Sequence, residues 1–359
     1  MENWNNSGHK IVDLEGLSLL EPELTRVNQH LERLCQSQNP SMQKILQWVL
    51  QARGKQLRPI LTLLFAKLAG KQVDATEIAA VIEICHTASL LHDDVIDEAE
   101  LRRGQLSVQK KFGREMAVYA GDFMIFSAIS RTSLVNKQWY RELFGNLEIL
   151  CDGEVEQFDN RFNTEISEEQ YLQNIVGKTC SVFRIACLAG AYEGKCNKAE
   201  RQAAEHFAES LGLAFQLRDD LMDFIATDTD TEKTVHQDFC CGYYTLPAIH
   251  TFTYLGCGDL LRKIAADLQS GIRFREEATA EISKLIEDAD GYGYTMRLIR
   301  GYCEEAICAL NIFRNSEAKR CLKQIAESVR EGAEHLMDNY RFAESFLSKS
   351  EKISSIRNV

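Results

Sequence analysis

The chain has 359 residues, of which 45% are hydrophobic and 26% charged, and its formal net charge is -12 at pH 7. This is an ordinary globular composition, and the acidic balance argues against nucleic acid as a partner, because a nucleic-acid interface needs a basic face. No proline occurs between Pro59 and Pro247. Because proline punctuates turns and strand edges, so long an interval favours an all-α chain over a β-sandwich.

The twelve cysteines include no Cys-x-x-Cys pair, which disfavours a structural zinc site. A chain of this length with a polar start and no signal-peptide pattern predicts reduced thiols in helical cores, and hence a cytoplasmic protein. No apolar run approaches the roughly 18 residues that a membrane helix needs. We therefore expect no transmembrane segment.

The first predicted helices follow a polar extension at residues 1–15. Apolar residues recur at spacings of three and four from Glu21 to Leu34, and a second apolar stripe covers residues 45–50. Pro59 predicts the first turn of a third helix, which Gly70 ends. Residues 76–96 are apolar on nearly all sides, which predicts a central, buried helix with an acidic far end.

The rest of the chain shows helical periodicity without strand alternation or a tandem repeat. Helices are predicted at 115–134, 138–160, 168–192, 199–224, 245–255, 259–269, 277–289, 293–312, 316–331 and 333–348. No Ser/Gly-rich linker divides them. We predict one all-α domain over residues 16–332, preceded by the extension at 1–15 and followed by a C-terminal helix and charged tail at 333–359.

Two Asp-Asp-x-x-Asp clusters carry the strongest chemical signal, at residues 93–97 and 219–223. Each follows an apolar helix, and residues i and i+4 share one helix face, so the outer aspartates of each cluster lie together. Like charges at a helix C-terminus repel one another and the helix dipole. Two copies at the same spacing indicate that cations compensate the charge, and carboxylates with phosphates suit Mg²⁺.

Basic residues are placed where they could bind the phosphates of a polyanion beside these clusters. They are Lys55 and Arg58 before the first cluster, Arg102 and Arg103 after it, Lys178 between the clusters, and Lys233 after the second. Arginine binds phosphate through its planar fork and lysine as a point charge. Any one of them alone is an ordinary surface charge, so the prediction rests on their joint placement.

Together these residues resemble the trans-type isoprenyl (polyprenyl) diphosphate synthase family. The matching motifs are Gly54 to Pro59 (Gly-Lys-x-x-Arg-Pro), the first aspartate cluster with Arg102-Arg103-Gly104, Gly121-Asp122, Lys178-Thr179, Phe215-Gln216 before the second cluster, and Asp238 with Thr245-Leu246-Pro247. Their order and spacing hold from about residue 20 to about residue 330. The combination is highly specific.

The resemblance implies a bundle of antiparallel helices around a central cavity, usually assembled as a homodimer. It also implies a chemistry, the Mg²⁺-dependent condensation of an allylic diphosphate with isopentenyl diphosphate. Loss of diphosphate from an allylic carbon separates charge, which metal ions and fixed cations stabilise best in a dry site. The double bond of isopentenyl diphosphate then attacks, and a proton leaves. No protein nucleophile is needed, which agrees with the absence of a triad motif.

Roles follow for the matching positions. Asp93, Asp97 and Asp219 would hold Mg²⁺ on the allylic diphosphate, with Asp94, Asp220 and Asp223 in support. Arg102, Lys178 and Lys233 would bind that diphosphate, and Lys55, Arg58, His86 and Arg103 the isopentenyl diphosphate. Thr179 and Gln216 would face the reacting carbons. The predicted catalytic set is Asp93, Asp94, Asp97, Lys178, Thr179, Gln216 and Asp219.

The sequence departs from the family pattern in the loop after the second cluster. Many members have two lysines there; the first corresponds to Lys233, and Tyr243 replaces the second. A phenol donates one hydrogen bond but carries no charge at pH 7. The pattern gives Cys240 and Cys241 no role.

Residues one turn before the first cluster bear on product length. Ala88 and Ser89 lie five and four residues before Asp93, on the path that a growing product would follow down the helix. In the family, bulky aromatic residues near here tend to stop elongation. The small residues therefore predict a medium or long product, with Phe123, Met124 and Phe126 as candidates for the floor of the cavity.

Two other readings compete with a polyprenyl diphosphate synthase. A terpene synthase on the same fold would not add isopentenyl diphosphate, so Lys55, Arg58 and Arg103 would have no substrate; Tyr243 alone favours it weakly. A non-catalytic subunit of a heteromeric synthase would be expected to lose aspartates, and all six are present. We further expect only transient membrane contact, for product release.

Overall fold

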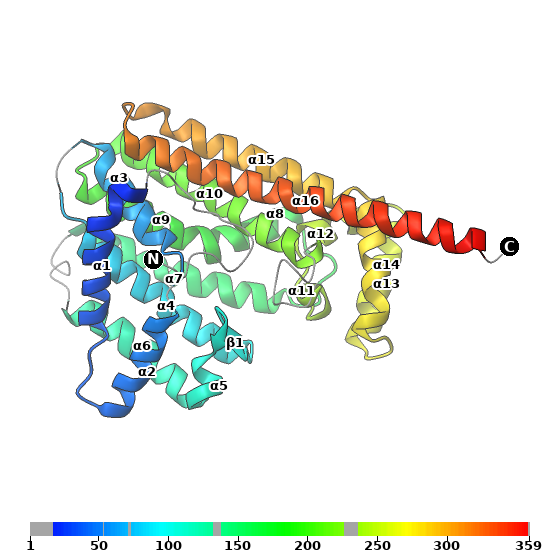
Figure 1. Ribbon diagram of the computed structural model, residues 1–359, viewed down its shortest axis with the longest axis horizontal. Helices are drawn as coiled ribbons and strands as arrows, with labels where there is room; N and C mark the ends of the chain where they lie inside the picture. Colours follow the sequence, from blue (N-terminus) through cyan, green and yellow to red (C-terminus); the bar gives the residue numbers. More distant parts are fainter. Residues whose placement is uncertain (1–16, 53, 71–72, 132–137, 226–235, 358–359) are drawn as a thin grey trace.

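The computed structural model describes residues 17–52, 54–70, 73–131, 138–225 and 236–357. These residues are almost entirely helical, as the sequence predicts (Figure 1). The first half consists of η1 (Leu17–Leu20), α1 (Glu21–Leu34), α2 (Pro40–Gln51), α3 (Leu57–Leu68), α4 (Thr76–Ile96), α5 (Val108–Phe112), α6 (Arg114–Arg131) and α7 (Gln138–Asp159). A short antiparallel hairpin follows α4, and its strands β1 (Leu101–Arg102) and β2 (Gln105–Leu106) have two residues each.

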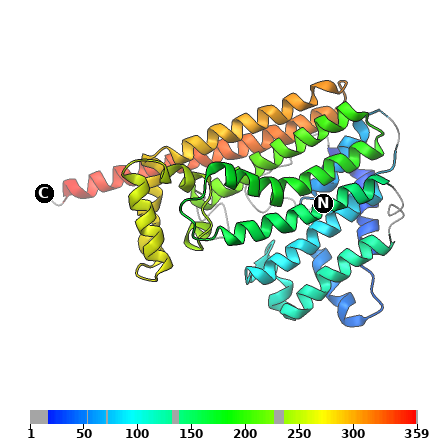
Figure 2. The same cartoon turned by 180° about the vertical axis from the view of Figure 1, so that it is seen from behind.

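The second half contains α8 (Glu168–Ile175), the π-helix η3 (Val176–Cys180), α9 (Ser181–Glu193), α10 (Lys198–Ile225), α11 (Gln237–Cys240), α12 (Leu246–Phe252), α13 (Cys257–Gln269), α14 (Arg275–Asp288), α15 (Gly291–Ala309), η4 (Leu310–Ile312) and α16 (Glu317–Arg357). The long helices α10, α15 and α16 pack along one another. The pair α13 and α14 stands off the end of this layer, as the front and rear views show (Figures 1 and 2).

Local sequence signals explain where the early helices begin. The Asn39 side chain accepts hydrogen bonds from the backbone N–H groups of Ser41 and Met42, at 2.9 and 3.2 Å, and so caps α2. Helix α3 begins two residues before Pro59, which still lies in the first turn. Helix α4 buries most of its length, from Thr76 through Ile84, so the central, buried helix is confirmed.

The predicted helix over residues 168–192 is interrupted by the π-helix η3. An extra residue per turn rotates the side chains that follow it, and π-bulges are frequent at functional sites. This one contains Lys178 and Thr179, two residues predicted to act in catalysis. The stretch Glu168–Glu193 is apolar and long enough to cross a membrane, but 67% of its most apolar window is buried inside the protein, as in the core helices of soluble proteins.

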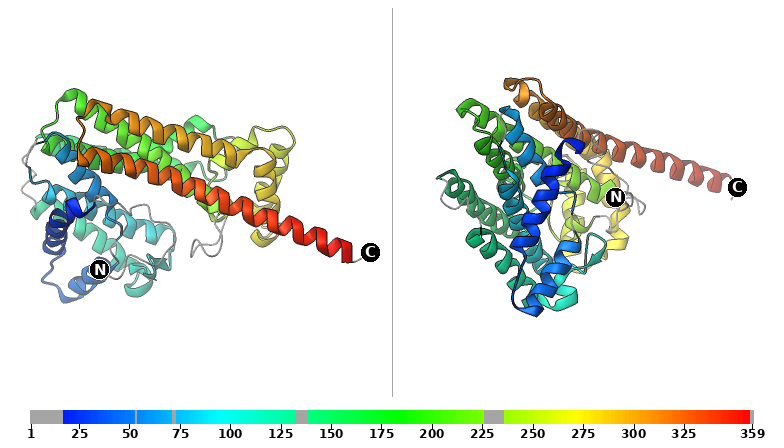
Figure 3. Two further views of the ribbon diagram at one scale, coloured as in Figure 1. Left: turned by 45° about the horizontal axis from the view of Figure 1, so that its top comes forward. Right: turned by 60° about the vertical axis from the view of Figure 1, so that its left-hand side comes forward.

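The predicted break between helices 316–331 and 333–348 is wrong. Helix α16 runs without interruption from Glu317 to Arg357, and its end projects beyond the bundle (Figure 3). A single glycine inside a helix costs only about 1 kcal/mol relative to alanine. Ala333 and Leu336, in the helical turn that follows Gly332, are buried, and their burial offsets the cost of the glycine. The helix crosses the predicted domain boundary at residue 332, and the domain division itself stays a prediction.

Candidate active site

The first aspartate cluster ends α4, and its middle carboxylate faces the protein interior. Asp94 is buried, and the Nε atom of Arg102 donates to its Oδ1 atom at 2.7 Å. The β1–β2 hairpin returns Arg102 toward α4 through a tight turn, in which Arg103 and Gly104 have φ values of 53° and 74°. The Arg-Arg-Gly motif therefore supplies both a partner for Asp94 and the turn that places it.

The outer aspartates of this cluster face a lysine and a third carboxylate. The Nζ atom of Lys178 lies 2.8 Å from the Oε2 atom of Glu154 and 2.9 Å from the Oε1 atom of Gln157, both on α7. Burial, together with the charges of Glu154 and Asp97, raises the pKa of Asp93 to about 6, against the attraction of Lys178. Lys178 alone does not neutralise these carboxylates, so the group retains excess negative charge.

A close helix approach places Lys178 and Thr179. A Cβ atom on Gly153 of α7 would lie 2.9 Å from the backbone nitrogen of Lys178, so only glycine permits this packing. From the same π-helix, the hydroxyl of Thr179 donates to the Oε1 atom of Gln216 at 2.7 Å. The Nε2 atom of Gln216 in turn donates to Asp220 at 2.7 Å. The structure thus joins the Lys-Thr pair to both aspartate clusters.

The second cluster ends α10, and its middle carboxylate also faces inward. Asp220 is buried, and it accepts hydrogen bonds from the hydroxyl of Tyr171 and the amide of Gln216. Burial is the main cause that raises the pKa of Asp220 to about 7, with the charges of Asp238 and Asp219 adding to it. Among the described residues, the hydrogen-bond donors to this carboxylate are neutral, in contrast to the donor to Asp94.

Hydrogen bonds from neighbouring residues fix the outer aspartates of the second cluster. Arg218 is buried and donates to the Oδ1 atom of Asp219 at 2.6 Å. Asp223 accepts the backbone N–H groups of Gln237 and Asp238, at 3.2 and 3.3 Å. Burial and the charge of Asp238 raise the pKa of Asp223 to about 6. Both carboxylates are fixed in place while remaining partly accessible.

A basic group lies beside the aspartates. Arg58 is half-buried, its buried Nε atom has no hydrogen-bond partner among the residues that the structure describes, and its guanidinium lies 5.3 Å from the ring centroid of Phe183. Burial lowers the pKa of Arg58 to about 10, although Glu83 opposes the shift. Burial and the nearby charges of Arg58 and Arg103 also hold the pKa of His86 well below its ordinary value. This accumulation of positive charge is suited to binding an anion.

Sequence reasoning gave no role to five residues that support this arrangement. They are Glu83, Glu154, Tyr171, Arg218 and Asp238, which face Arg58, Lys178, Asp220, Asp219 and Asp223 respectively. Three of them had a visible signal: Glu83 is the one charged residue in the apolar run between Ile78 and Leu91, Arg218 directly precedes the second cluster, and Asp238 belongs to one of the matching motifs. Glu154 and Tyr171 lie in ordinary polar stretches, and only the packing of distant helices brings them to the site.

The residues predicted to set product length lie in different environments. Ala88 is fully buried, Ser89 and Phe123 are half-buried, and Phe126 is 66% exposed. A small cavity of about 20 Å³ is lined on α4 by Thr87 and on α6 by Met124. Nothing here decides their roles, which stay predictions. Lys233 lies outside the described residues.

The aspartates suit hard cations in chemistry, although no three acidic, histidine or cysteine side chains in the described part of the chain converge on one metal-sized point. Burial, together with the charge of neighbouring carboxylates, raises the pKa of Asp93 and of Asp223, so a bound cation would stabilise both charged groups. Oxygen ligands with missing counter-charge fit Mg²⁺ that arrives with a substrate phosphate. The residues present therefore fit the metal that the sequence predicts.

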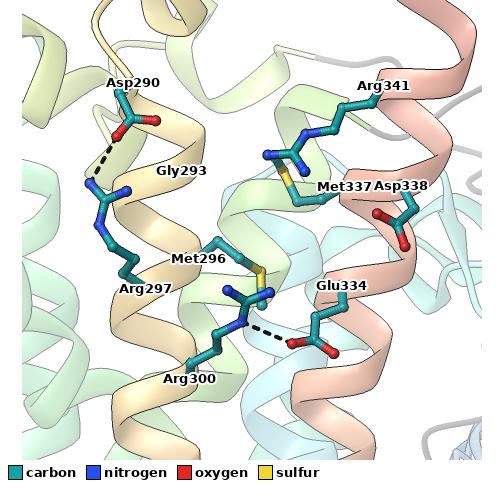
Figure 4. Close-up of a pocket in the computed structure, with 9 residues that line it drawn as sticks. All are labelled: Asp290, Gly293, Met296, Arg297, Arg300, Glu334, Met337, Asp338 and Arg341. Atoms are coloured by element: carbon teal, nitrogen blue, oxygen red, sulfur yellow. Dashed lines mark hydrogen bonds and ion pairs between the residues drawn. The ribbon is translucent and has the colours of Figure 1, made fainter.

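A separate cleft of about 470 Å³ lies between α15 and α16 (Figure 4). Its arginines are largely neutralised in place, since Arg297 pairs with Asp290 and Arg300 pairs with Glu334, both at 2.8 Å. None of the residues predicted for catalysis lines this cleft. It is distinct from the aspartate site.

Known proteins resemble this chain over most of its length. Residues 39–282 match the family model for polyprenyl synthetase. The octaprenyl diphosphate synthase of Haemophilus influenzae is 30% identical over 310 residues, which are 86% of this chain and 93% of the relative. Component 2 of the heptaprenyl diphosphate synthase of Bacillus subtilis is 28% identical over 87% of this chain and 88% of the relative.

Solved structures agree with these sequence relatives. The decaprenyl diphosphate synthase from Rhodobacter capsulatus superposes with a TM-score of 0.82 at 26% identity, covering 88% of this chain and 98% of the other. A polyprenyl synthase from Caulobacter crescentus, crystallised with calcium and isoprenyl diphosphate, gives 0.81 at 28% identity, covering 88% and 96%.

Proposed function

The chain belongs to the polyprenyl synthetase family and is a prenyltransferase with the all-α isoprenoid synthase fold; from this premise, we propose that it condenses an allylic diphosphate with isopentenyl diphosphate in a Mg²⁺-dependent reaction. The observation that carries the proposal is the pairing of two opposite charge groups. Burial and neighbouring carboxylates raise the pKa of Asp93 on α4 and of Asp223 on α10, whereas burial and the charge of Arg103 lower the pKa of Arg58, so a cation at the aspartates and an anion beside Arg58 would each be stabilised. Two diphosphates, one with Mg²⁺ and one without, satisfy both.

Asp93, Asp97 and Asp219 would hold the Mg²⁺ ions, because their carboxylates are partly accessible. Asp94 and Asp220 face the protein and support the outer aspartates, while Asp223 is fixed by the backbone of the following segment. When bound, the metal neutralises negative charge on the diphosphate that leaves the allylic carbon. This division of roles among the six aspartates is part of the proposal.

The remaining residues bind and orient the substrates. Lys178 would place a positive charge at the leaving diphosphate, and the hydrogen bond from Thr179 fixes the amide of Gln216 toward the reacting carbons. Lys55, Arg58, His86 and Arg103 would hold isopentenyl diphosphate. The proton lost after condensation can pass to the released diphosphate, so the protein needs no base of its own.

We further propose a medium or long-chain product. The named relatives make octaprenyl, heptaprenyl and decaprenyl diphosphates, and the small side chains of Ala88 and Ser89 leave space one turn below the first cluster. The basic group argues against the terpene-synthase alternative, because isopentenyl diphosphate is the ligand that Lys55, Arg58 and Arg103 would bind.

We also propose a cytoplasmic homodimer. Several large apolar side chains on α6 and α7 are exposed in the single chain, among them Tyr119, Phe126, Val155 and Phe158. Large apolar side chains left exposed on two helices are candidates for burial in an interface. The Bacillus subtilis relative is component 2 of its synthase, which leaves a heteromer as the alternative, and the molar mass of the purified protein in solution decides between them.

The direct test is an assay of the purified protein with Mg²⁺, isopentenyl diphosphate and allylic diphosphates of increasing length. We expect polyprenyl diphosphates of at least six isoprene units, measured by product chain length. Lys55→Ala should raise the KM for isopentenyl diphosphate about tenfold or more, since a charged contact contributes roughly 1.5–3 kcal/mol. Ionisation of the allylic substrate without condensation would instead support the terpene-synthase reading.

A further inference from the structure

The turn that contains Tyr243 packs closely against the turn that follows α7. The backbone N–H of Phe162 donates to the carbonyl of Gly242 at 2.8 Å. Gly242 has a φ of 84°, and a Cβ atom there would lie 2.5 Å from the Phe162 ring, so the two turns touch closely. Phe162 itself has a φ of 63°, which is rare for an aromatic residue. Strained backbone of this kind persists where the surroundings enforce it, often at functional sites.

The contact between these two turns positions the side chain of Arg161. Its Nε atom donates to the carbonyl of Cys241 at 2.6 Å, and its guanidinium carbon lies 5.2 Å from the ring centroid of Tyr243. The carbonyl bond uses one of the five guanidinium N–H groups. The side chain is otherwise exposed, and the terminal nitrogens can bind an anion.

Tyr243 connects Arg161 to the aspartate site. Asp97 and Lys178 both lie within electrostatic reach of the Tyr243 phenol, on the side of the first cluster. The described residues whose charges act on this phenol include a carboxylate predicted to hold Mg²⁺, a lysine predicted to bind diphosphate, and Arg161, whose guanidinium carbon lies against the ring. The hydrogen bond to Cys241 fixes the arginine at this edge of the site.

We propose that Arg161, held over Tyr243, is a further binding residue for the diphosphate of the allylic substrate. The arginine would supply the charge that a phenol at position 243 lacks, and the ring would orient the guanidinium plane. The proposal rests on the function proposed above and adds to it one residue and one substrate. It also gives Cys241 a role, through its backbone carbonyl rather than its thiol.

The test compares Arg161→Gln with a matched control, Arg201→Gln. Glutamine can still donate to the Cys241 carbonyl, so it removes the charge with little change of structure. Arg201 makes comparable contacts at the opposite end of α10 from the aspartates: its terminal Nη1 atom donates to the carbonyl of Cys196 at 2.6 Å, and its guanidinium carbon lies 4.9 Å from the Tyr192 centroid. Glutamine is too short to keep that terminal bond, so the control is the more disruptive of the two changes. Any effect of losing a stacked, carbonyl-bound arginine in general appears in both variants.

We expect Arg161→Gln to raise the KM for the allylic diphosphate about tenfold, the low end for an exposed charged contact, and to leave the KM for isopentenyl diphosphate unchanged. Arg201→Gln should match the wild type in both. Adding Tyr243→Lys to Arg161→Gln should return the allylic KM to within a few-fold of the wild type, because a lysine restores the charge. Unchanged allylic KM in Arg161→Gln, or an equal rise for both substrates, would overturn the proposal.

A binding experiment separates this inference from the proposed reaction. Calorimetric titration of inorganic diphosphate with Mg²⁺ measures the anion site without requiring turnover. Weaker binding in Arg161→Gln than in Arg201→Gln supports the role of Arg161 even if the wild type forms no prenyl product, a result that would overturn only the proposed reaction. Equal binding in the two variants, with normal product formation, would overturn only the role of Arg161.

Discussion

The cluster at the end of α4 holds its middle carboxylate against a guanidinium, whereas the cluster at the end of α10 holds the equivalent carboxylate between a phenol and an amide. Arg102 therefore compensates the charge of Asp94, while the hydrogen bonds to Asp220 within the described part of the chain come from the uncharged Tyr171 and Gln216. Lys178 likewise faces the first cluster, not the second. One sequence pattern thus occurs in two electrostatic environments.

The aspartates within each cluster differ in burial, and therefore in the role that each can have. In each cluster the middle aspartate is buried and bonded to the protein, and the first aspartate stays partly accessible. Burying a carboxylate requires hydrogen-bonding partners, so the middle residue serves as an anchor for the end of its helix. The accessible aspartates then remain for cations.

The largest effect on turnover is expected at the first aspartate of each cluster, which is partly accessible in both. Asp93→Ala and Asp219→Ala should each lower kcat by about 10²–10³-fold or more, the range seen when one preorganised electrostatic contact at a reacting centre is lost. The fold should be retained in both variants: removing Asp93 relieves its repulsion with Glu154 and Asp97, whereas removing Asp219 takes a partner from the buried Arg218 and should lower the free energy of unfolding by roughly 1–3 kcal/mol. Steady-state kinetics and circular dichroism measure the two effects, with the exposed Asp259→Ala on α13 as control. Near-wild-type turnover in either variant would refute the metal assignment.

The next effect should distinguish the anchors. Arg102→Ala leaves Asp94 as a buried, unpaired charge and should lower the free energy of unfolding by about 3 kcal/mol, the low end for a broken buried pair because Arg102 is 34% exposed. Tyr171→Phe removes one hydrogen bond from Asp220, which keeps Gln216, and should cost about 1–2 kcal/mol. Urea unfolding of both variants without metal measures the difference. Equal losses would mean that the two anchors are equivalent after all.

Lys178 tests the asymmetry from the substrate side. Lys178→Met keeps the length of the side chain but removes the charge that faces Glu154, Asp93 and Asp97. We expect catalytic efficiency with the allylic substrate to fall about 10–100-fold, the equivalent of roughly 1.5–3 kcal/mol. The KM for isopentenyl diphosphate should not change. A selective loss of isopentenyl diphosphate binding would place Lys178 in the other half of the site.

Most of the helices and the residues with local motifs could be predicted from the sequence. Apolar periodicity located α1 and α4, and the aspartate spacing indicated the ends of α4 and α10, because these patterns arise within one helix. The π-helix at Lys178 and the unbroken helix through Gly332 could not be predicted, since packing between helices decides both. Likewise Glu154 and Tyr171 reach the site only through contacts that no local pattern encodes.

The smallest effect on turnover, but the sharpest difference between the clusters, concerns product length. Four residues before each cluster, α4 has the small Ser89 and α10 has the bulky Phe215, so we expect the growing product to run below the first cluster and not the second. Ser89→Phe should shorten the product by several isoprene units while ionisation of the allylic substrate survives, since the aspartates one turn above keep their places.

Substitutions at two further positions of α4 test whether the product follows this face of the helix. Ala88→Phe tests the same path, but Ala88 is fully buried, so overpacking should also lower the free energy of unfolding by about 1–3 kcal/mol. Val95→Phe, between the aspartates, should instead reduce turnover and leave product length unchanged. Product analysis by mass spectrometry reads all three variants. If Ser89→Phe and Ala88→Phe both yield the wild-type length, the product does not run along this face of α4, and the small residues there are ordinary packing.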